Sequence, residues 1–346
     1  MARTPTVFRW DDPGAPDLNA IMPTNNDKNK LFIHTVLKAC LVDGYGDKAA
    51  AGWSMPQEEI TSGGCRFVLT NAANSGSLLY EGGEFSGSST ALEHNTVWAC
   101  LDAADMNAPL NAWSHSTKYE DRNTVAGAFF HKTGLYQGSR CDAWMVIANE
   151  NTVIFYSGRS AVEFSAASNS GAAASIVCEF MFGAMHDGRG GIDSPGAGNF
   201  YIVGGASGRY AANAWYDSFK DVLTSIVDVI GLAKVEAHSF SYNKPAFEKT
   251  YSALSAWLPV PYVYMQYGPS GPDGVSSNHM YFAVALPSIR KLFLQPFDAA
   301  TLNTFMLDNG FDYAKPFTYQ GESWVVIKSV DDVVQVFGLA ASEWGA

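Results

Sequence analysis

The stretch from Phe8 to Trp53 constrains the fold of this chain more than any other. It begins with an aromatic and proline-rich turn signal at residues 8–16 and ends with a glycine-rich signal at residues 41–53. Between them, apolar residues recur at positions i, i+3, i+4, i+7 and i+8, namely Ile33, Val36, Leu37, Cys40 and Leu41. This spacing predicts one apolar face of an α-helix.

Residues that favour helix ends flank this apolar face. Asn-Asn-Asp at 25–27 stands where N-caps belong, and Gly44 and Gly46 supply the stop. We therefore predict a helix of about four turns, at a rise of roughly 1.5 Å per residue. Such a short helix is marginal alone and needs a sheet to cover. If Trp10 and Trp53 anchor the two turns, Trp10→Ala should cost about 3–5 kcal/mol as a large core truncation.

The same stretch resembles a family of virion structural proteins of tailed bacteriophages. The resemblance rests on Arg-Trp-Asp-Asp-Pro-Gly-Ala-Pro (9–16), a helix, Leu-Val-Asp-Gly-Tyr-Gly (41–46) and Ala-Gly-Trp (51–53). This first block is the specific one. Genes of this family lie among head and tail genes, so the resemblance implies the phage particle as the setting and supplies no catalytic residues.

Weaker patterns extend the resemblance along the chain. They run through Trp144–Tyr156 and Phe180–Gly191, and more faintly through Pro259–Phe297. The resemblance therefore covers much of the chain.

The composition is typical of a folded, strand-rich protein. Hydrophobic residues make up 47% of the chain, as in other globular proteins, while charged residues, at 16%, fall below the usual quarter or so. Aromatic residues reach 13%, and 32 glycines point to many turns between short strands. With 346 residues, the chain can bury one large core or two ordinary ones.

The charge balance is acidic throughout. Lys and Arg number 22 against 34 Asp and Glu, giving a net charge of −12 that is spread along the chain without an acidic tail. Binding to nucleic acid or to an anionic membrane requires clustered cations, so we expect neither partner.

The cysteines predict buried free thiols. Their spacing is wide and irregular and lacks Cys-x-x-Cys, which argues against a disulfide framework and a zinc site. The five are Cys40, Cys65, Cys100, Cys141 and Cys178. The sequence Met1–Pro5 lacks the apolar run of a signal peptide, and no window approaches the roughly 18 apolar residues of a membrane span. We therefore expect synthesis in the host cytoplasm, and the resemblance to virion proteins implies final localisation in the virion.

Alternating and compact apolar runs predict strands along much of the chain. They lie at residues 65–70, 78–80, 96–101, 144–148, 152–156, 176–182, 200–203, 260–267, 280–286 and 324–328. Asn149–Asn151 is predicted to form a hairpin turn, because asparagine tolerates the left-handed conformation. The strands from 144 to 203 are expected to form the middle of one antiparallel sheet.

Other segments favour turns, loops or a second helix. Residues 55–64 are predicted as a polar turn and 103–121 as irregular. Helical spacing at residues 215–230 indicates a helix, preceded by a linker at 204–210. Residues 331–337 fit either a strand or a short helix.

The expected fold is mainly β, an antiparallel sheet or sandwich with one or two covering α-helices. We place a β-rich N-terminal domain with the early helix at residues 1–210 and a smaller α+β part at 211–346. A single fused domain is the alternative.

No motif for catalysis or cofactor binding stands out. The seven histidines include no pair at i, i+3 or i, i+4, so no helical metal pair is present. Residues 321–325 fail the Gly-x-Ser-x-Gly pattern at its last position, and no phosphate-binding glycine loop occurs. We therefore predict no catalytic, cofactor-binding or metal-binding residue and no enzymatic activity.

Calcium binding is the best local alternative. Asp187 and Asp193 in the glycine-rich loop 186–199 offer oxygen ligands that suit this ion. A plain connection between strands is the favoured interpretation, because Gly and Asp are ordinary turn residues. Asp11, Asp12 and Asp17 also offer oxygen ligands for calcium, and an ordinary turn is again the favoured interpretation.

The expected function is that of a non-enzymatic building block of a tailed-phage particle, acting through contacts with copies of itself and with other virion proteins. Tail or baseplate is the first choice, and head, neck or collar the second. Symmetric assembly is expected, as for most homo-oligomers. The alternative is a carbohydrate-binding or depolymerising protein that recognises a host surface glycan. It requires a groove of exposed aromatic rings with paired acids, whereas assembly buries aromatic residues between subunits.

Overall fold

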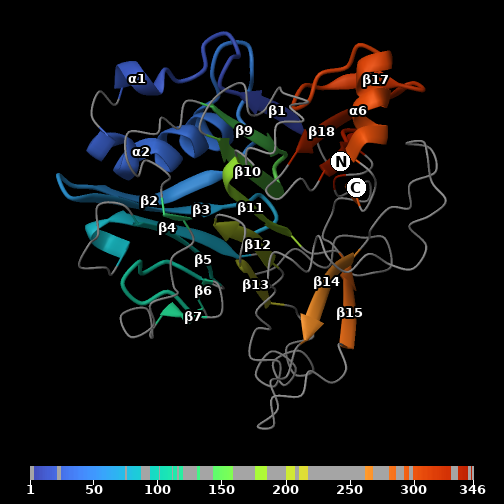
Figure 1. Ribbon diagram of the computed structural model, residues 1–346. Helices are drawn as coiled ribbons and strands as arrows, with labels where there is room; N and C mark the ends of the chain where they lie inside the picture. The colour runs from blue at the N-terminus through green and yellow to red at the C-terminus, as the bar shows by residue number, and fades with distance from the viewer. Residues whose placement is uncertain are drawn as a thin grey trace.

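In the described part of the computed structural model, antiparallel sheets dominate and helices are few, so the prediction of a mainly β fold is confirmed (Figure 1). The structure describes residues 4–21, 25–74, 76–86, 94–100, 102–110, 112–114, 117–119, 131–132, 143–158, 176–184, 200–206, 210–216, 262–267, 280–285, 292–295, 299–328, 334–341 and 344. None of the helices in these ranges is long and apolar enough to cross a membrane.

The first sheet contains six strands in the order β1-β9-β10-β11-β12-β13, each antiparallel to its neighbour. Their bounds are β1 (Thr6–Arg9), β9 (Ala143–Ala148), β10 (Thr152–Gly158), β11 (Ile176–Ala184), β12 (Phe200–Ala206) and β13 (Tyr210–Tyr216). The predicted hairpin turn at 149–151 is confirmed. The Asn149 side-chain oxygen accepts hydrogen bonds from the backbone N–H groups of Asn151 (3.0 Å) and Thr152 (2.9 Å).

The second sheet follows the order β2-β3-β4-β5-β6-β7, with β8 paired to β5. These strands are β2 (Ser54–Ile60), β3 (Gly64–Thr70), β4 (Ser77–Gly83), β5 (His94–Cys100), β6 (Trp113–Ser114), β7 (Thr117–Lys118) and β8 (His131–Lys132), and a 3-10 turn η2 (Glu84–Ser86) follows β4. Both faces are covered, since Phe67 and Leu69 join the main core while Val68 packs with Trp98 in a smaller one. Alternate residues of β3 thus serve two cores.

The predicted helix forms and packs against this sheet. Helix α2 (Asn25–Leu37) contacts β3, β4 and β5, and all five residues of the predicted apolar face are fully buried. The last turn differs from the prediction, because residues Lys38–Asp43 form a π-helical segment, η1, that ends at Gly44. The main core joins this helix to both sheets through residues such as Phe8, Tyr80 and Phe155.

The two tryptophans of the opening stretch differ in burial. Trp53 is 5% exposed, and its Nε1 donates a hydrogen bond of 2.7 Å to the carbonyl oxygen of Asn149. Trp10 is only partly buried against the core, and its ring carries the Arg9 guanidinium 4.6 Å from its centroid. The cost of Trp10→Ala stays a prediction, and we expect it to lie below that of a fully buried ring, because Trp10 loses less apolar contact than a core residue such as Trp53.

The C-terminal part contains two small sheets. One pairs β14 (Tyr262–Tyr267) with β15 (Met280–Ala285), and the other has the order β16-β19-β18-β17. The strands of the latter are β16 (Leu292–Gln295), β17 (Phe317–Tyr319), β18 (Glu322–Lys328) and β19 (Val334–Gly338). Within the described residues, the other α-helices are α1 (Leu18–Ile21) and α6 (Ala299–Asp308).

Several local predictions are wrong. Residues 55–64, predicted as a polar turn, contain most of β2, whose side chains alternate between exposed and half-exposed because β2 is an edge strand. The predicted linker at 204–210 includes the end of β12, and Trp215 lies in β13 rather than in a helix. Residues 217–261 lie outside the described part of the chain. The ambiguous segment 331–337 contributes to strand β19.

The predicted domain boundary near residue 210 stays a prediction. Strand β13 continues the sheet of β12 as far as Tyr216. Trp344, in the C-terminal part, also reaches the first sheet at its β9–β10 turn, because its carbonyl oxygen accepts a hydrogen bond of 2.7 Å from Asn149 Nδ2.

Candidate functional site

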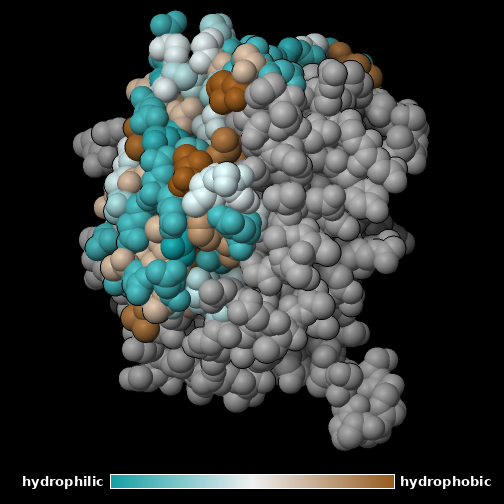
Figure 2. Space-filling view, turned by 90° about the vertical axis from the view of Figure 1, so that its left-hand side faces the viewer, coloured by the Kyte–Doolittle hydropathy of each residue, from teal (hydrophilic) through white to brown (hydrophobic). Residues whose placement is uncertain are grey.

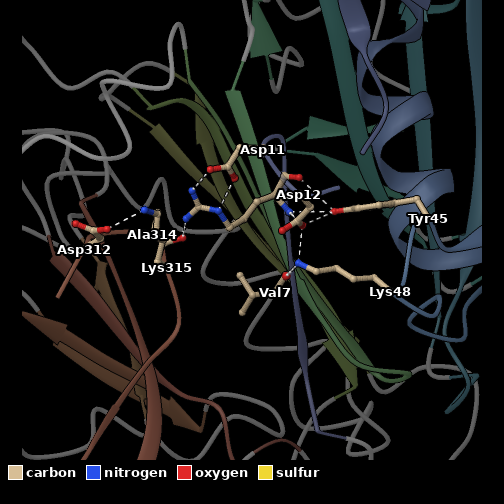
Figure 3. A network of polar contacts seen from close by, with 9 residues as sticks. Val7, Asp11, Asp12, Tyr45, Lys48, Asp312, Ala314 and Lys315 are labelled. Atoms are coloured by element: carbon tan, nitrogen blue, oxygen red, sulfur yellow. Dashed lines mark hydrogen bonds and ion pairs between the residues drawn. The ribbon is translucent and has the colours of Figure 1, made fainter. Parts of the chain in front are cut away.

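Asp12 is the centre of a polar cluster built by the opening stretch (Figure 3). Its Oδ2 accepts hydrogen bonds from the backbone N–H of Arg9 (2.6 Å), the Tyr45 hydroxyl (2.8 Å) and Lys48 Nζ (2.5 Å). Lys48 Nζ also donates to the carbonyl oxygen of Val7 at 2.5 Å. This cluster joins the end of β1 to the turn that follows η1.

Tyr45 is a structural member of the cluster rather than an acid or base. Its ring lies 5.7 Å from Phe8 and 6.1 Å from Trp144, centroid to centroid. Burial raises the pKa of Tyr45 far above that of an ordinary tyrosine, and the Asp12 carboxylate adds to this effect. The hydroxyl therefore stays protonated and serves as a hydrogen-bond donor.

Arg9 connects the opening stretch to the C-terminal part of the chain. Its guanidinium pairs with both carboxylate oxygens of Asp11 at 2.7 and 2.8 Å and donates to the carbonyl oxygen of Ala314 (Figure 3). Arg9 is 6% exposed, and it holds the pKa of Asp11 below the usual range. A buried guanidinium needs such partners, since an unpaired buried charge is costly.

The aspartates considered as calcium ligands are engaged by other groups. Asp11 pairs with Arg9 and Asp12 with Lys48, while Asp17 Oδ1 accepts hydrogen bonds from the backbone N–H groups of Asn19 and Ala20 at the start of α1. Within the described ranges, no group of three or more His, Cys, Asp or Glu residues is placed to hold a metal ion. The loop 186–199, with Asp187 and Asp193, lies outside these ranges.

A second polar cluster ties the helix to the edge of the second sheet. Glu58 on β2 is hydrogen-bonded to His34 Nε2. Its two carboxylate oxygens also accept hydrogen bonds of 2.9 and 3.0 Å from Lys38 Nζ. The His34 ring packs edge-on against Phe67 at 5.3 Å, and burial lowers the pKa of His34. A His–Glu pair is capable of acid–base chemistry. Here the His34 side chain is 9% exposed and packs against Phe67, so the imidazole has little contact with solvent.

A third carboxylate is buried on the outer face of the second sheet. Glu81 is 1% exposed and accepts hydrogen bonds of 2.9 Å from Trp98 Nε1 and from the Tyr119 hydroxyl. Sequence reasoning did not single out Glu81, although an acid within an apolar strand pattern was the available signal. These bonds stabilise the smaller core.

The predicted thiols and histidines can be placed only in part. Cys40, Cys65 and Cys100 are buried free thiols, as predicted, and burial raises the pKa of Cys65 to about 12. Such thiols are poor nucleophiles. Cys141 lies outside the described residues, as do His115, His186, His238 and His279. For Cys178, His94 and His131 only the backbone, in strands, is described.

An aromatic cluster on the surface was not predicted. It consists of Phe305, Phe311, Phe317 and Tyr319, all half-exposed, and is called the aromatic edge below. Phe311 stacks on Phe317 at 4.3 Å, and Phe305 meets Tyr319 edge-on at 5.0 Å, centroid to centroid.

Two turns assemble the aromatic edge. Helix α6 ends in a Schellman motif, in which the backbone N–H of Gly310 binds the Leu307 carbonyl (3.1 Å) and that of Phe311 binds the Met306 carbonyl (2.8 Å). This motif turns Phe311 back onto the helix. A two-residue turn with positive φ at Gln320 and Gly321 then folds β17 onto β18.

No known family model matches the chain, and no curated protein matches it either.

Proposed function

We propose that the chain is a structural component of a tailed-bacteriophage virion that acts through protein–protein contacts. Tail or baseplate is the first assignment within the particle, and head, neck or collar the second. The partners are copies of the chain and other virion proteins.

The observation that carries this proposal is the aromatic edge. Half-exposed aromatic rings are typical of protein interfaces, where they bury a large area with little loss of side-chain entropy. In Figure 1, α6 and β17 lie at the periphery, away from α1 and α2. By contrast, the opposite face is mainly hydrophilic where it is described, with hydrophobic residues in small separate groups (Figure 2). Such scattered residues are ordinary on any soluble surface.

The charged clusters also favour a structural role. Three charged residues form direct hydrogen bonds to elements that are distant in the sequence: Asp12 to Tyr45, Glu58 to Lys38 and Arg9 to Ala314. The block that resembles the virion family is thus a stable framework in which the conspicuous polar residues support the fold.

A glycan-binding role is the second candidate, because the aromatic edge is accompanied by exposed carboxylates at Asp308 and Asp312. A protein that binds or cleaves glycans requires aromatic rings that stack on the sugars, with acidic side chains nearby. In the aromatic edge, however, Phe311 and Phe317 stack on each other, so that one face of each ring is already covered.

Cryo-electron microscopy of intact particles from the source tests the proposal. We expect density for the chain in a symmetric ring or shell, with the aromatic edge at a contact with another virion protein. Absence of the chain from purified particles would overturn the virion assignment. An aromatic edge that faces solvent on the particle and binds host polysaccharide would establish the glycan-binding alternative.

A further inference from the structure

The aromatic edge lies beside an open strand. Among the described strands, β17 pairs only with β18 and forms the margin of its sheet. Tyr319 and Glu322 flank the two-residue turn and are therefore a hydrogen-bonded pair. The next residue, Thr318, directs its backbone N–H and C=O away from β18. An edge with free backbone groups is a site for addition of another strand.

The charges around the aromatic edge favour a cationic partner. Asp308 is the last residue of α6, where the negative end of the helix dipole disfavours a carboxylate, and the last turn contains no basic residue. Lys315 already pairs with Asp312 at 2.7 Å, and Asp308 is exposed. These two carboxylates and one ammonium leave an excess of negative charge on the segment that carries Phe305 and Phe311, whose ring faces also attract cations.

A second copy of the chain fits this surface poorly. Its net charge is −12, and the acidic residues are spread along its length, so two copies would bring like charges together here. An extended segment of a different protein, with apolar side chains flanked by Lys or Arg, satisfies the open strand, the rings and the carboxylates together.

We infer that the aromatic edge docks an extended, lysine- or arginine-flanked segment of a second virion protein, which adds as a strand to β17. The inference rests on the proposed function and names the partner's chemistry. The backbone of Thr318 supplies hydrogen bonds, the rings supply apolar contact, and Asp308 supplies the charge that selects a cationic partner.

Two synthetic peptides test this on the full chain by titration calorimetry and hydrogen exchange. One has the sequence Lys-Lys-Val-Thr-Val-Thr-Val-Lys-Lys, and the other replaces every Lys by Glu. We expect only the lysine peptide to bind, with slower exchange at residues 317–319. Its affinity should fall as salt is raised, because exposed charges are screened over about 10 Å at 0.1 M.

Two variants separate binding from folding. Asp308→Lys should lower the affinity for the lysine peptide at least ~5-fold, because it replaces an attractive charge pair by a repulsive one. The same change should stabilise α6 slightly, because a cation at the helix C-terminus interacts favourably with the helix dipole. Thr318→Pro should abolish strand addition without disturbing the β18 ladder, since its N–H faces outward. Thr318→Ala, the matched control, should bind like the native chain.

The inference would be overturned if the two peptides bound equally well or if neither bound. It would also be overturned if peptide binding slowed hydrogen exchange outside residues 305–322. These outcomes leave the virion assignment standing if particles contain the chain. Conversely, peptide binding by a chain absent from particles would overturn the proposed function and leave the strand-docking surface established.

Discussion

Gly14 and Gly46 meet backbone against backbone: a Cβ atom on Gly14 would lie 2.9 Å from the Cα of Gly46. Both glycines have positive φ, +80° and +53°, a conformation that other residues adopt only with strain. A Cβ on Gly46 would also collide with the carbonyl oxygen of Pro13. The two turn signals that flank the first helix are therefore in direct contact, and the glycines make this contact sterically feasible.

Gly46→Ala should accordingly destabilise the fold by about 3 kcal/mol or more, because the strain of positive φ adds to a backbone clash. Gly321→Ala is the matched control, since Gly321 has φ +81° with nothing within 4 Å of the added Cβ. It should cost only about 1 kcal/mol. Chemical denaturation of both variants measures the difference, and equal losses would show that the Pro13 contact is not tight.

Asp12→Asn should destabilise the chain by about 1–3 kcal/mol, because Lys48 and the Tyr45 hydroxyl lose a charged acceptor in a half-buried site. Asp47→Asn removes a charge from the same turn at an exposed position and should stay within about 0.5 kcal/mol. Urea melts at pH 7 compare the two. Similar values for both variants would mean that Asp12 contributes only to net charge.

The features that could be predicted from the sequence are those encoded by local periodicity. The apolar face from Ile33 to Leu41 has helical spacing and is buried as predicted, although its last two residues lie in the π-helical segment η1. The hairpin at Asn149–Asn151 forms between two apolar runs, as predicted. Strand β2 could not be recognised because an edge strand carries few apolar residues. Its strand conformation depends on pairing with the neighbouring strand and not on a residue pattern of its own. Helix α6 was missed although Gly310 marks its end.

The polar clusters depend on distances that a sequence does not reveal. Arg9 and Ala314 are 305 positions apart, and Lys38 and Glu58 are 20 apart on different elements. In the sequence, Arg9, Lys38 and Glu58 each look like an ordinary surface charge. Only the folded chain shows which of these charges are buried and paired, as Arg9 is.

His34 should make stability depend on pH. Burial lowers its pKa from the ordinary 6.5, so below pH 6.5 the unfolded chain takes up a proton that the folded chain resists. The stability associated with His34 is therefore complete above pH 6.5 and is lost as the pH falls from there to the folded-state pKa. His34→Gln, which keeps a hydrogen-bond partner for Glu58, should lose less stability than the native chain between pH 7.5 and 5.5.

Glu58→Gln provides the opposite test of this site. It removes the carboxylate that favours protonated His34, so the fall in stability below pH 6.5 should become steeper. Thermal melts at several pH values distinguish the variants. If all three proteins lose stability in parallel, His34 is not the group that titrates.

Truncation of the two tryptophans of the opening stretch to alanine should reduce folding stability by different amounts. Trp53→Ala should cost about 3–5 kcal/mol, because Trp53 is 5% exposed in the main core and its Nε1 caps the carbonyl of Asn149. Trp10→Ala should cost only about 1–2 kcal/mol, since its ring is half-exposed. Trp53→Phe separates packing from hydrogen bonding, because it keeps most of the apolar volume and loses the Nε1 donor. An intermediate value in denaturant melts is expected for it, and a Trp10→Ala loss equal to that of Trp53→Ala would show that both rings anchor the fold.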